Sequence, residues 1–275
     1  MTSAMFGTDR RKKPFPLDYD ERGYAYVERP NTALLRLLED WAPSAIDSAS
    51  ILDVGCGAGA NARAIRERHP EVRITGIEPD ARAAELARQA CDEVVHGTLA
   101  DFVAGGPAQT FDAVILSDVL EHVPEPVRFL RELLALPGCA RARYFVSVPN
   151  YAVWYNRLRT LAGDFSYAWS GLYDRTHLRF FTRRSVRQLL EHCALDVLEQ
   201  RATPSLAQSA APLLRRFFDA DALRGEHLSL GQSNAFRAYS RFVEPLESKF
   251  CALWPELFAF QIVSVAEPHS RAAFS

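Results

Sequence analysis

The sequence has no long apolar run. None of its 275 residues falls in an apolar stretch approaching the ~18–20 residues that a membrane-spanning helix needs. The first residues also lack the hydrophobic segment of a secretory signal peptide. We therefore expect a cytoplasmic protein with no membrane partner.

Cysteine and metal-binding patterns are also sparse. The five cysteines are odd in number and form no C-x-x-C pair, which favours reduced, mostly buried thiols. No H-x-x-H or H-E-x-x-H pattern occurs, so the sequence predicts no metal site.

An excess of charge is missing as well. The formal net charge is −2, which argues against a dedicated nucleic-acid surface. The basic cluster at residues 10–13 belongs to a polar tail, 1–18, that we expect to be poorly ordered. The length suits one large domain, or a core with insertions.

What the sequence does contain is a glycine-rich turn after a short apolar run. Ile51 to Val54 leads into Gly55, Gly57 and Gly59, and residues 61–69 have the pattern of an amphipathic helix. This order of strand, tight turn and helix opens a nucleotide-binding α/β sheet. Glycine suits the turn because a ligand can approach the backbone closely and φ can be positive.

Two cofactor classes use such a turn. Gly55, Gly57 and Ala60 fit the dinucleotide pattern G-x-G-x-x-G/A, which is a weak signal by itself. Asp53 lies two residues before the first glycine, and a third glycine stands at position 59. Both features favour a cofactor that is not a dinucleotide.

Polar residues follow the later strands. The predicted strand 72–77 ends in Glu78 and Pro79, and a carboxylate there can accept hydrogen bonds from both hydroxyls of a ribose. A continuous apolar strand, 111–116, runs into Ser117 and Asp118, as expected for a strand buried on both faces. The strand 143–148 ends at Asn150, where ligands of doubly wound sheets bind.

These motifs together resemble those of class I S-adenosylmethionine (SAM)-dependent methyltransferases, over residues 51–182 and a final strand near 258–266. The resemblance implies an α/β fold: a Rossmann-like, doubly wound, mostly parallel seven-stranded sheet with an antiparallel edge strand. It also implies that SAM is the co-substrate. The cofactor-binding residues that we expect are Asp53, Gly55, Gly57, Gly59, Glu78, Pro79, Leu99, Ala100, Asp101, Ser117, Asp118 and His122.

Two parts of this assignment leave alternatives open. Thr98 stands where relatives often carry an aspartate that reads the adenine, and Asp101 is the nearest substitute. His122 is either a general base, a residue packed on the cofactor, or a structural histidine that caps its turn. Near the N-terminus, Tyr24 and Tyr26 either face the sulfonium through cation–π attraction or only pack on the core.

Aromatic residues become dense after the fifth predicted strand. We interpret residues 150–181 as containing a lid over the pocket, and the segment 173–182 resembles one in methyltransferases of sugar, lipid and natural-product pathways. Arg175 is a further acceptor-side candidate, with a surface pair to Asp174 as the alternative. The candidate catalytic residues are Asn150, His122, Tyr155, Tyr173 and His177.

The predicted organisation has six parts: the tail 1–18, a helical cap 19–50, the SAM-binding core 51–203, a helical insertion 204–257, a core strand 258–267 and a tail 268–275. The insertion is either a second lid or a dimer surface.

The leading functional hypothesis is methyl transfer from SAM to a small-molecule acceptor in metabolism or natural-product biosynthesis. An alternative keeps the fold and cyclises SAM to azetidine-2-carboxylate and 5′-methylthioadenosine. A non-catalytic SAM-binding protein and an NAD(P) dehydrogenase are further alternatives.

Overall fold

A seven-stranded sheet forms the centre of the computed structural model, which describes residues 29–41, 46–168, 171–204 and 244–269. The strand order is β3-β2-β1-β4-β5-β7-β6, and the pairs from β3 to β5 are all parallel. The strands are β1 (Ser50–Val54), β2 (Arg73–Glu78), β3 (Glu93–His96), β4 (Ala113–Ser117), β5 (Arg143–Pro149), β6 (Leu195–Pro204) and β7 (Ala259–Pro268).

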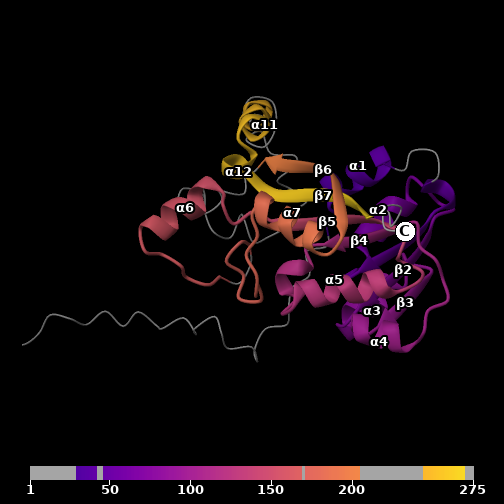
Figure 1. Cartoon of the computed structure of the whole chain (residues 1–275). Coiled ribbons are helices and arrows are strands. Elements are labelled where there is room, and N and C mark those ends of the chain that lie inside the picture. The colour runs from indigo at the N-terminus through magenta and orange to yellow at the C-terminus, as the bar shows by residue number, and fades with distance from the viewer. Residues whose placement is uncertain (1–28, 42–45, 169–170, 205–243, 270–275) are drawn as a thin grey trace, which may run out of the picture.

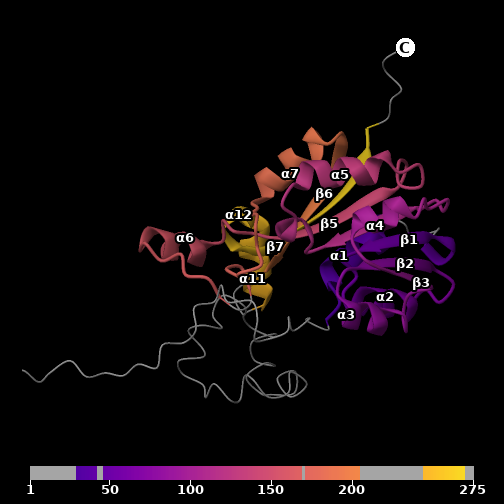
Figure 2. The same ribbon diagram turned by 90° about the horizontal axis from the view of Figure 1, so that it is seen from below.

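Helices cover both faces of this sheet. Figure 2 shows α2 and α3 on one side and α5 and α7 on the other. The described helices are α1 (Thr32–Trp41), α2 (Ala60–Arg66), α3 (Ala81–Ala87), α4 (Leu99–Ala104), α5 (Pro126–Ala135), α6 (Trp154–Leu161), α7 (Arg183–His192), α11 (Glu244–Leu253) and α12 (Pro255–Phe258), with short 3-10 turns η1 (Ile46–Ser48) and η2 (Leu120–His122).

Two hydrophobic cores follow from the alternation of side chains along each strand. Ile51 packs with α1, α2 and α3 on one face of the sheet, whereas its neighbour Leu52 packs with α4, α5 and α7 on the other. Because successive residues of a strand point to opposite faces, a strand covered on both sides must be apolar throughout. The predicted doubly wound α/β fold is confirmed.

The last strand of the chain, β7, is not at the edge of the sheet. β7 is antiparallel, as expected, but it lies between β5 and β6, pairing Ser147 with Val263 and Arg201 with Val263 on its two sides. β6 is therefore the outermost strand at this end of the sheet. Two partners for β7 explain why residues 259–268 are so apolar.

The lid region contains a helix that the sequence patterns did not predict. α6 stands away from the sheet in both views (Figures 1 and 2). Helix α1 lies within the predicted helical cap 19–50, and α11 lies within the predicted helical insertion 204–257. The tail 1–18, Tyr24, Tyr26 and most of the insertion lie outside the described residues.

No helix within the described part of the chain is long and apolar enough to cross a membrane. All five cysteines are buried, as predicted.

Candidate cofactor and acceptor site

The glycine turn between β1 and α2 needs glycine at three positions. Gly55, Gly57 and Gly59 all have positive φ, at 72°, 54° and 80°. A Cβ on Gly59 would also lie 3.1 Å from the Cα of Ala87 in α3. Side chains are therefore excluded by conformation and, at Gly59, by packing as well. The turn presents bare backbone at the carboxyl end of β1, where a ligand can approach it.

Glu78 fixes this turn from the end of the neighbouring strand. Its side chain is 2% exposed. Oε2 accepts a 2.9 Å hydrogen bond from the backbone N–H of Gly57, and Oε1 accepts one of 2.9 Å from Asp80. A carboxylate has about four acceptor sites, so a group that fixes the turn can also accept hydrogen bonds from a ligand.

Asp53 is the second buried carboxyl group of this region. It is 1% exposed, and neither carboxyl oxygen has a hydrogen-bond partner among the described residues. Burial, followed by the nearby charge of Glu78, raises the pKa of Asp53 to about 7. A buried carboxyl group without a donor is costly, which indicates that this position is completed by a ligand.

Asp118 stands at the carboxyl end of β4 in a left-handed conformation, with φ of 56°. Its carboxylate accepts a 2.7 Å hydrogen bond from Nε2 of Gln261 in β7 and a 3.2 Å bond from Oγ of Ser147 in β5. Burial raises the pKa of Asp118, while these two hydrogen bonds act against that change. Asp118 thus joins three strands at the end of the sheet where the glycine turn lies.

Asn31 connects the N-terminal segment to the same end of the sheet. Its backbone N–H donates to Oδ1 of Asn61 at 2.8 Å, and Nδ2 donates to Oγ of Ser147 at 3.0 Å. The contact from Nδ2 to Oγ of Ser117 is 3.4 Å. No sequence pattern used above pointed to Asn31, Asn61, Ser147 or Gln261, although an asparagine directly before an amphipathic helix is a typical N-cap signal.

The other residues expected to bind the cofactor differ in their exposure to solvent. Leu99 is buried in the core, Ala100 is exposed, and Pro79 is exposed at the end of β2. Asp101 is exposed, and its Oδ2 accepts hydrogen bonds of 2.7 Å from both N and Oγ1 of Thr98. This capping box of α4 explains the Thr98–Asp101 pair and lowers the pKa of Asp101. A role for Asp101 at the adenine remains a prediction.

The lid has a small core of its own. Tyr151, Phe165, Tyr173 and Phe180 pack against one another, with ring centroids 4.9–5.9 Å apart in the pairs that contact. Tyr173 is 3% exposed, and the guanidinium of Arg159 lies 4.0 Å from its ring centroid. The structure therefore corrects the expectation that Tyr173 faces a substrate, because its ring packs inside the lid.

Tyr155 is half-buried at the base of α6, beside Trp154. Burial and the neighbouring Tyr173 raise the pKa of Tyr155 above its ordinary value. A phenol in this state is a hydrogen-bond donor and not a general base.

Asn150 does not reach a pocket. It is 0% exposed, and its Nδ2 donates to the carbonyls of Ala259 and Glu256 at 2.9 and 3.2 Å. Its Oδ1 accepts from the backbone N–H of Ala152 at 3.1 Å. The prediction that Asn150 is catalytic is therefore wrong: the amide joins β5 to the chain around α12 and holds the base of the lid.

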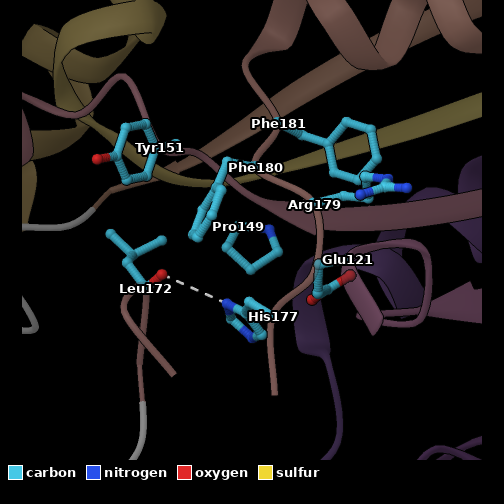
Figure 3. Close-up of a pocket in the computed structure, with 8 residues that line it drawn as sticks. All are labelled: Glu121, Pro149, Tyr151, Leu172, His177, Arg179, Phe180 and Phe181. Atoms are coloured by element: carbon cyan, nitrogen blue, oxygen red, sulfur yellow. Dashed lines mark hydrogen bonds between the residues drawn. The ribbon is translucent and has the colours of Figure 1, made fainter. Parts of the chain in front are cut away.

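His177 does line a pocket, together with residues that sequence reasoning did not select. Figure 3 shows this pocket between the end of β5, the lid region and Glu121 of η2. Its walls are Glu121, Pro149, Tyr151, Leu172, His177, Arg179, Phe180 and Phe181. His122 packs edge-on against His177, with 4.8 Å between ring centroids.

A larger hollow lies at the opposite end of the strands. Trp41, Asp112, Arg143 and Glu267 are among its walls, at or near the amino ends of β4 and β5. Ligands of doubly wound sheets bind at the carboxyl ends, so this hollow is not the expected site.

Comparisons with known proteins agree with this geometry. The sequence matches the family model described as a methyltransferase domain over residues 25–200, well over half of the chain. A ubiquinone biosynthesis O-methyltransferase of Methylocella silvestris is 27% identical over 168 residues, which cover 58% of this chain and 63% of that protein. A trans-aconitate 2-methyltransferase of Azoarcus sp. is 34% identical over 88 residues, 32% of this chain and 34% of that protein. The matched segments thus span less than two thirds of these relatives.

Solved structures show the same fold. A SAM-dependent methyltransferase from Archaeoglobus fulgidus aligns with 86% of this chain and 93% of its own, with a TM-score of 0.50 and 18% identity. The [4+2]-cyclase SpnF aligns with 86% of this chain and 81% of its own, with a TM-score of 0.52 and 18% identity. From its sequence match and its fold, the chain belongs to the methyltransferase domain family.

Proposed function

We propose that the protein binds SAM and transfers its methyl group to a small-molecule acceptor. The observation that carries this proposal is the pair of buried carboxyl groups, Asp53 and Glu78, on either side of the glycine turn. Asp53 has no donor among the described residues, and Glu78 is buried at the same end of the sheet, where it holds the turn. A ligand with an ammonium group and a ribose offers donors for both positions.

In this arrangement the methionine part of SAM lies along the glycine turn, with its ammonium group at Asp53. The ribose hydroxyls donate to Glu78, and the adenine lies near residues 98–102. Asp118 and Ser117 form the wall at the end of β4. This orientation brings the sulfonium toward the end of β5 and the lid.

Methyl transfer does not require the protein to form a covalent bond with the substrate. The methyl carbon of a sulfonium is electrophilic, so the protein must hold nucleophile, carbon and sulfur in line and exclude water. The aromatic wall of Tyr151, Phe180 and Phe181 suits this task, because it offers no competing nucleophile and attracts a cation. His122 or His177 is the base available to an acceptor hydroxyl. Burial lowers the pKa of both rings, which favours the neutral form that accepts a proton.

The first test is calorimetric titration with SAM and, separately, with NAD⁺. We expect SAM to bind to the wild type and to a control variant, Glu85→Gln, which changes an exposed side chain of α3. Asp53→Asn and Glu78→Gln should each weaken SAM binding at least tenfold, as expected for lost hydrogen bonds to a charged group. NAD⁺ binding, or SAM binding unchanged in both variants, would contradict the proposal.

A second candidate function is intramolecular cyclisation of SAM. The α-amine attacks Cγ as the Cγ–S bond breaks, which yields azetidine-2-carboxylate, 5′-methylthioadenosine and a proton. The pocket under the lid has mostly apolar and aromatic walls and room for about one water molecule, so it leaves no space for a second substrate. The [4+2]-cyclase among the similar structures is a protein of this fold whose name denotes another reaction.

Mass spectrometry after incubation with SAM alone separates these candidates. Accumulation of 5′-methylthioadenosine with a four-membered amino acid would support cyclisation and overturn methyl transfer. Formation of S-adenosylhomocysteine only when a metabolite extract is added would support methyl transfer, and the methylated product would identify the acceptor. Binding without either product would support a non-catalytic SAM-binding protein.

A further inference from the structure

Three side chains with metal-ligating atoms meet beside the pocket under the lid. Glu121 and His122 belong to η2 after β4, and His177 lies within the lid region, residues 150–181. Within the described residues these three form one group whose ligand atoms all lie within 4.8 Å of one another.

Main-chain hydrogen bonds bring the two segments together. The N–H groups of Leu178 and Arg179 both donate to the carbonyl of Glu121, at 2.7 and 3.0 Å. This pairing sets His177 against His122, although they are far apart in the sequence. The arrangement depends on backbone contacts, so it does not need a ligand to form.

Glu121 is the least satisfied member of the group. Its side chain is 1% exposed, and neither carboxyl oxygen has a hydrogen-bond partner among the described residues. Burial, followed by the charge of Asp118, raises the pKa of Glu121 well above its ordinary value. A buried carboxyl group in this position requires either a proton or a cation.

Both imidazoles are oriented in the same way. Nδ1 of His122 lies 3.2 Å from the carbonyl of Thr176, and Nδ1 of His177 lies 3.3 Å from the carbonyl of Leu172, the bond drawn in Figure 3. A carbonyl oxygen can only accept, so Nδ1 carries the proton in both rings. The lone pair of a neutral ring is then on Nε2. Histidines that ligate metals commonly donate their other N–H to a backbone carbonyl in this manner.

We propose that Glu121, His122 and His177 form a binding site for one divalent transition-metal ion. Two imidazole nitrogens and one carboxylate suit an ion such as Zn²⁺, which takes three protein ligands at sites that keep a position open. Two ligands at ~2.1 Å from one ion are at most ~4.2 Å apart. The ion would therefore draw the widest pair of atoms together by a small side-chain rotation.

The pocket gives this ion an open side. Glu121 and His177 line it together with Tyr151 and Phe180, as Figure 3 shows. If the proposed methyl transfer holds, an oxygen of the acceptor could occupy the open position. The ion would then lower the pKa of the acceptor hydroxyl in place of His122 or His177 acting as its base, because the Nε2 lone pairs of both rings would be on the ion. Binding of the ion itself does not depend on that proposal.

The experiment measures metal binding directly, with untagged protein treated with chelator and then dialysed. Titration with ZnCl₂ is followed by calorimetry, and titration with CoCl₂ by visible absorption. The test variants are Glu121→Gln, which keeps the shape of the side chain, and His177→Ala. The matched control is His269→Ala, which removes an exposed histidine that also pairs with a carboxylate, that of Asp196. Circular dichroism and SAM titration check that each variant is folded.

We expect one ion per chain in the wild type and in His269→Ala, and at least ~100-fold weaker binding in Glu121→Gln and His177→Ala. Bound Co²⁺ should show the absorption of a site with nitrogen and oxygen ligands. Absence of stoichiometric binding in the wild type, or binding in both test variants as tight as in the wild type, would overturn the proposal. Glu121 would then hold a proton shared with a neighbouring imidazole. SAM binding is measured separately. A wild type that binds no SAM would count against the proposed function and not against the metal site.

Discussion

The backbone N–H of Gly57 donates a 2.9 Å hydrogen bond to Oε2 of Glu78, so the glycine turn after β1 is held by the side chain that ends β2. A carboxylate that already orients the turn is held rigidly for a second task. The same group can therefore fix the loop and receive the ligand that the loop binds.

Replacement of Glu78 by glutamine should therefore affect both the loop and the ligand. We expect SAM affinity to fall at least tenfold and the unliganded protein to lose about 1–3 kcal/mol of stability, because Gln has only one acceptor oxygen for the two N–H donors. Calorimetry and urea unfolding measure the two effects. A variant that binds SAM like the wild type would show that the turn does not depend on this bond.

Asp53→Asn should change how stability depends on pH. The pKa of Asp53 is raised from 3.8 to about 7 in the folded protein, so between these values the folded state binds more protons than the unfolded state. The stability of the wild type therefore falls as the pH rises through this window, by up to about 4 kcal/mol. The asparagine variant has no such carboxyl group to ionise. Its free energy of unfolding, relative to that of the wild type, should therefore increase from pH 5 to pH 8.

Urea unfolding without SAM at both values of pH measures this difference. Glu85→Gln is the control, because Glu85 is exposed and its partner, Arg88, is an arginine and not a histidine. Parallel curves for Asp53→Asn and wild type at pH 5 and pH 8 would show that Asp53 is not buried and unpartnered in solution.

Gly59→Ala should cost more than a glycine substitution at another position of positive φ. Gly59 and Gly106 have φ of 80° and 62°, but a Cβ on Gly59 meets the Cα of Ala87 at 3.1 Å, whereas one on Gly106 meets nothing within 4 Å. We expect about 1 kcal/mol of destabilisation for Gly106→Ala from strain alone, and about 2–4 kcal/mol for Gly59→Ala. Thermal unfolding compares the two variants. Equal losses would mean that α2 and α3 are not in close contact.

Asn150→Ala should act on stability and leave SAM binding unchanged. The substitution removes one acceptor from the N–H of Ala152 and one donor from each of two main-chain carbonyls, all at the base of the lid. We expect a loss of about 2–4 kcal/mol, because buried partners are left unsatisfied. A variant of full stability with no turnover would restore the catalytic interpretation that the geometry contradicts.

The strand ends and the glycine turn could be predicted because their signals are local. Apolar runs broken by glycine or by a polar residue, as at Asp53, Glu78 and Ser117, mark the carboxyl ends of strands. In a parallel sheet these ends lie on one edge. The positions of Asp53, Gly55 and Glu78 in the structure follow directly from that rule.

Asn150 shows the limit of the same rule. It does follow a central strand, as predicted, but whether its side chain faces a pocket depends on what packs above it. That neighbour is the main chain around α12 and β7, more than a hundred residues later. Tyr173 is a similar case, since an aromatic residue of a lid can face the ligand or its own neighbours.

The sequence by itself therefore determined the order of strands and helices, the glycine turn and the buried carboxyl groups at the strand ends, because these depend on periodicity and on the conformational freedom of single residues. Only the tertiary structure decided that Gln261 binds Asp118, that Asn150 supports the lid, and that Glu121 meets His122 and His177. Those contacts join segments far apart in the chain. They depend on which strands are neighbours and how the segments between them pack, which no local pattern specifies.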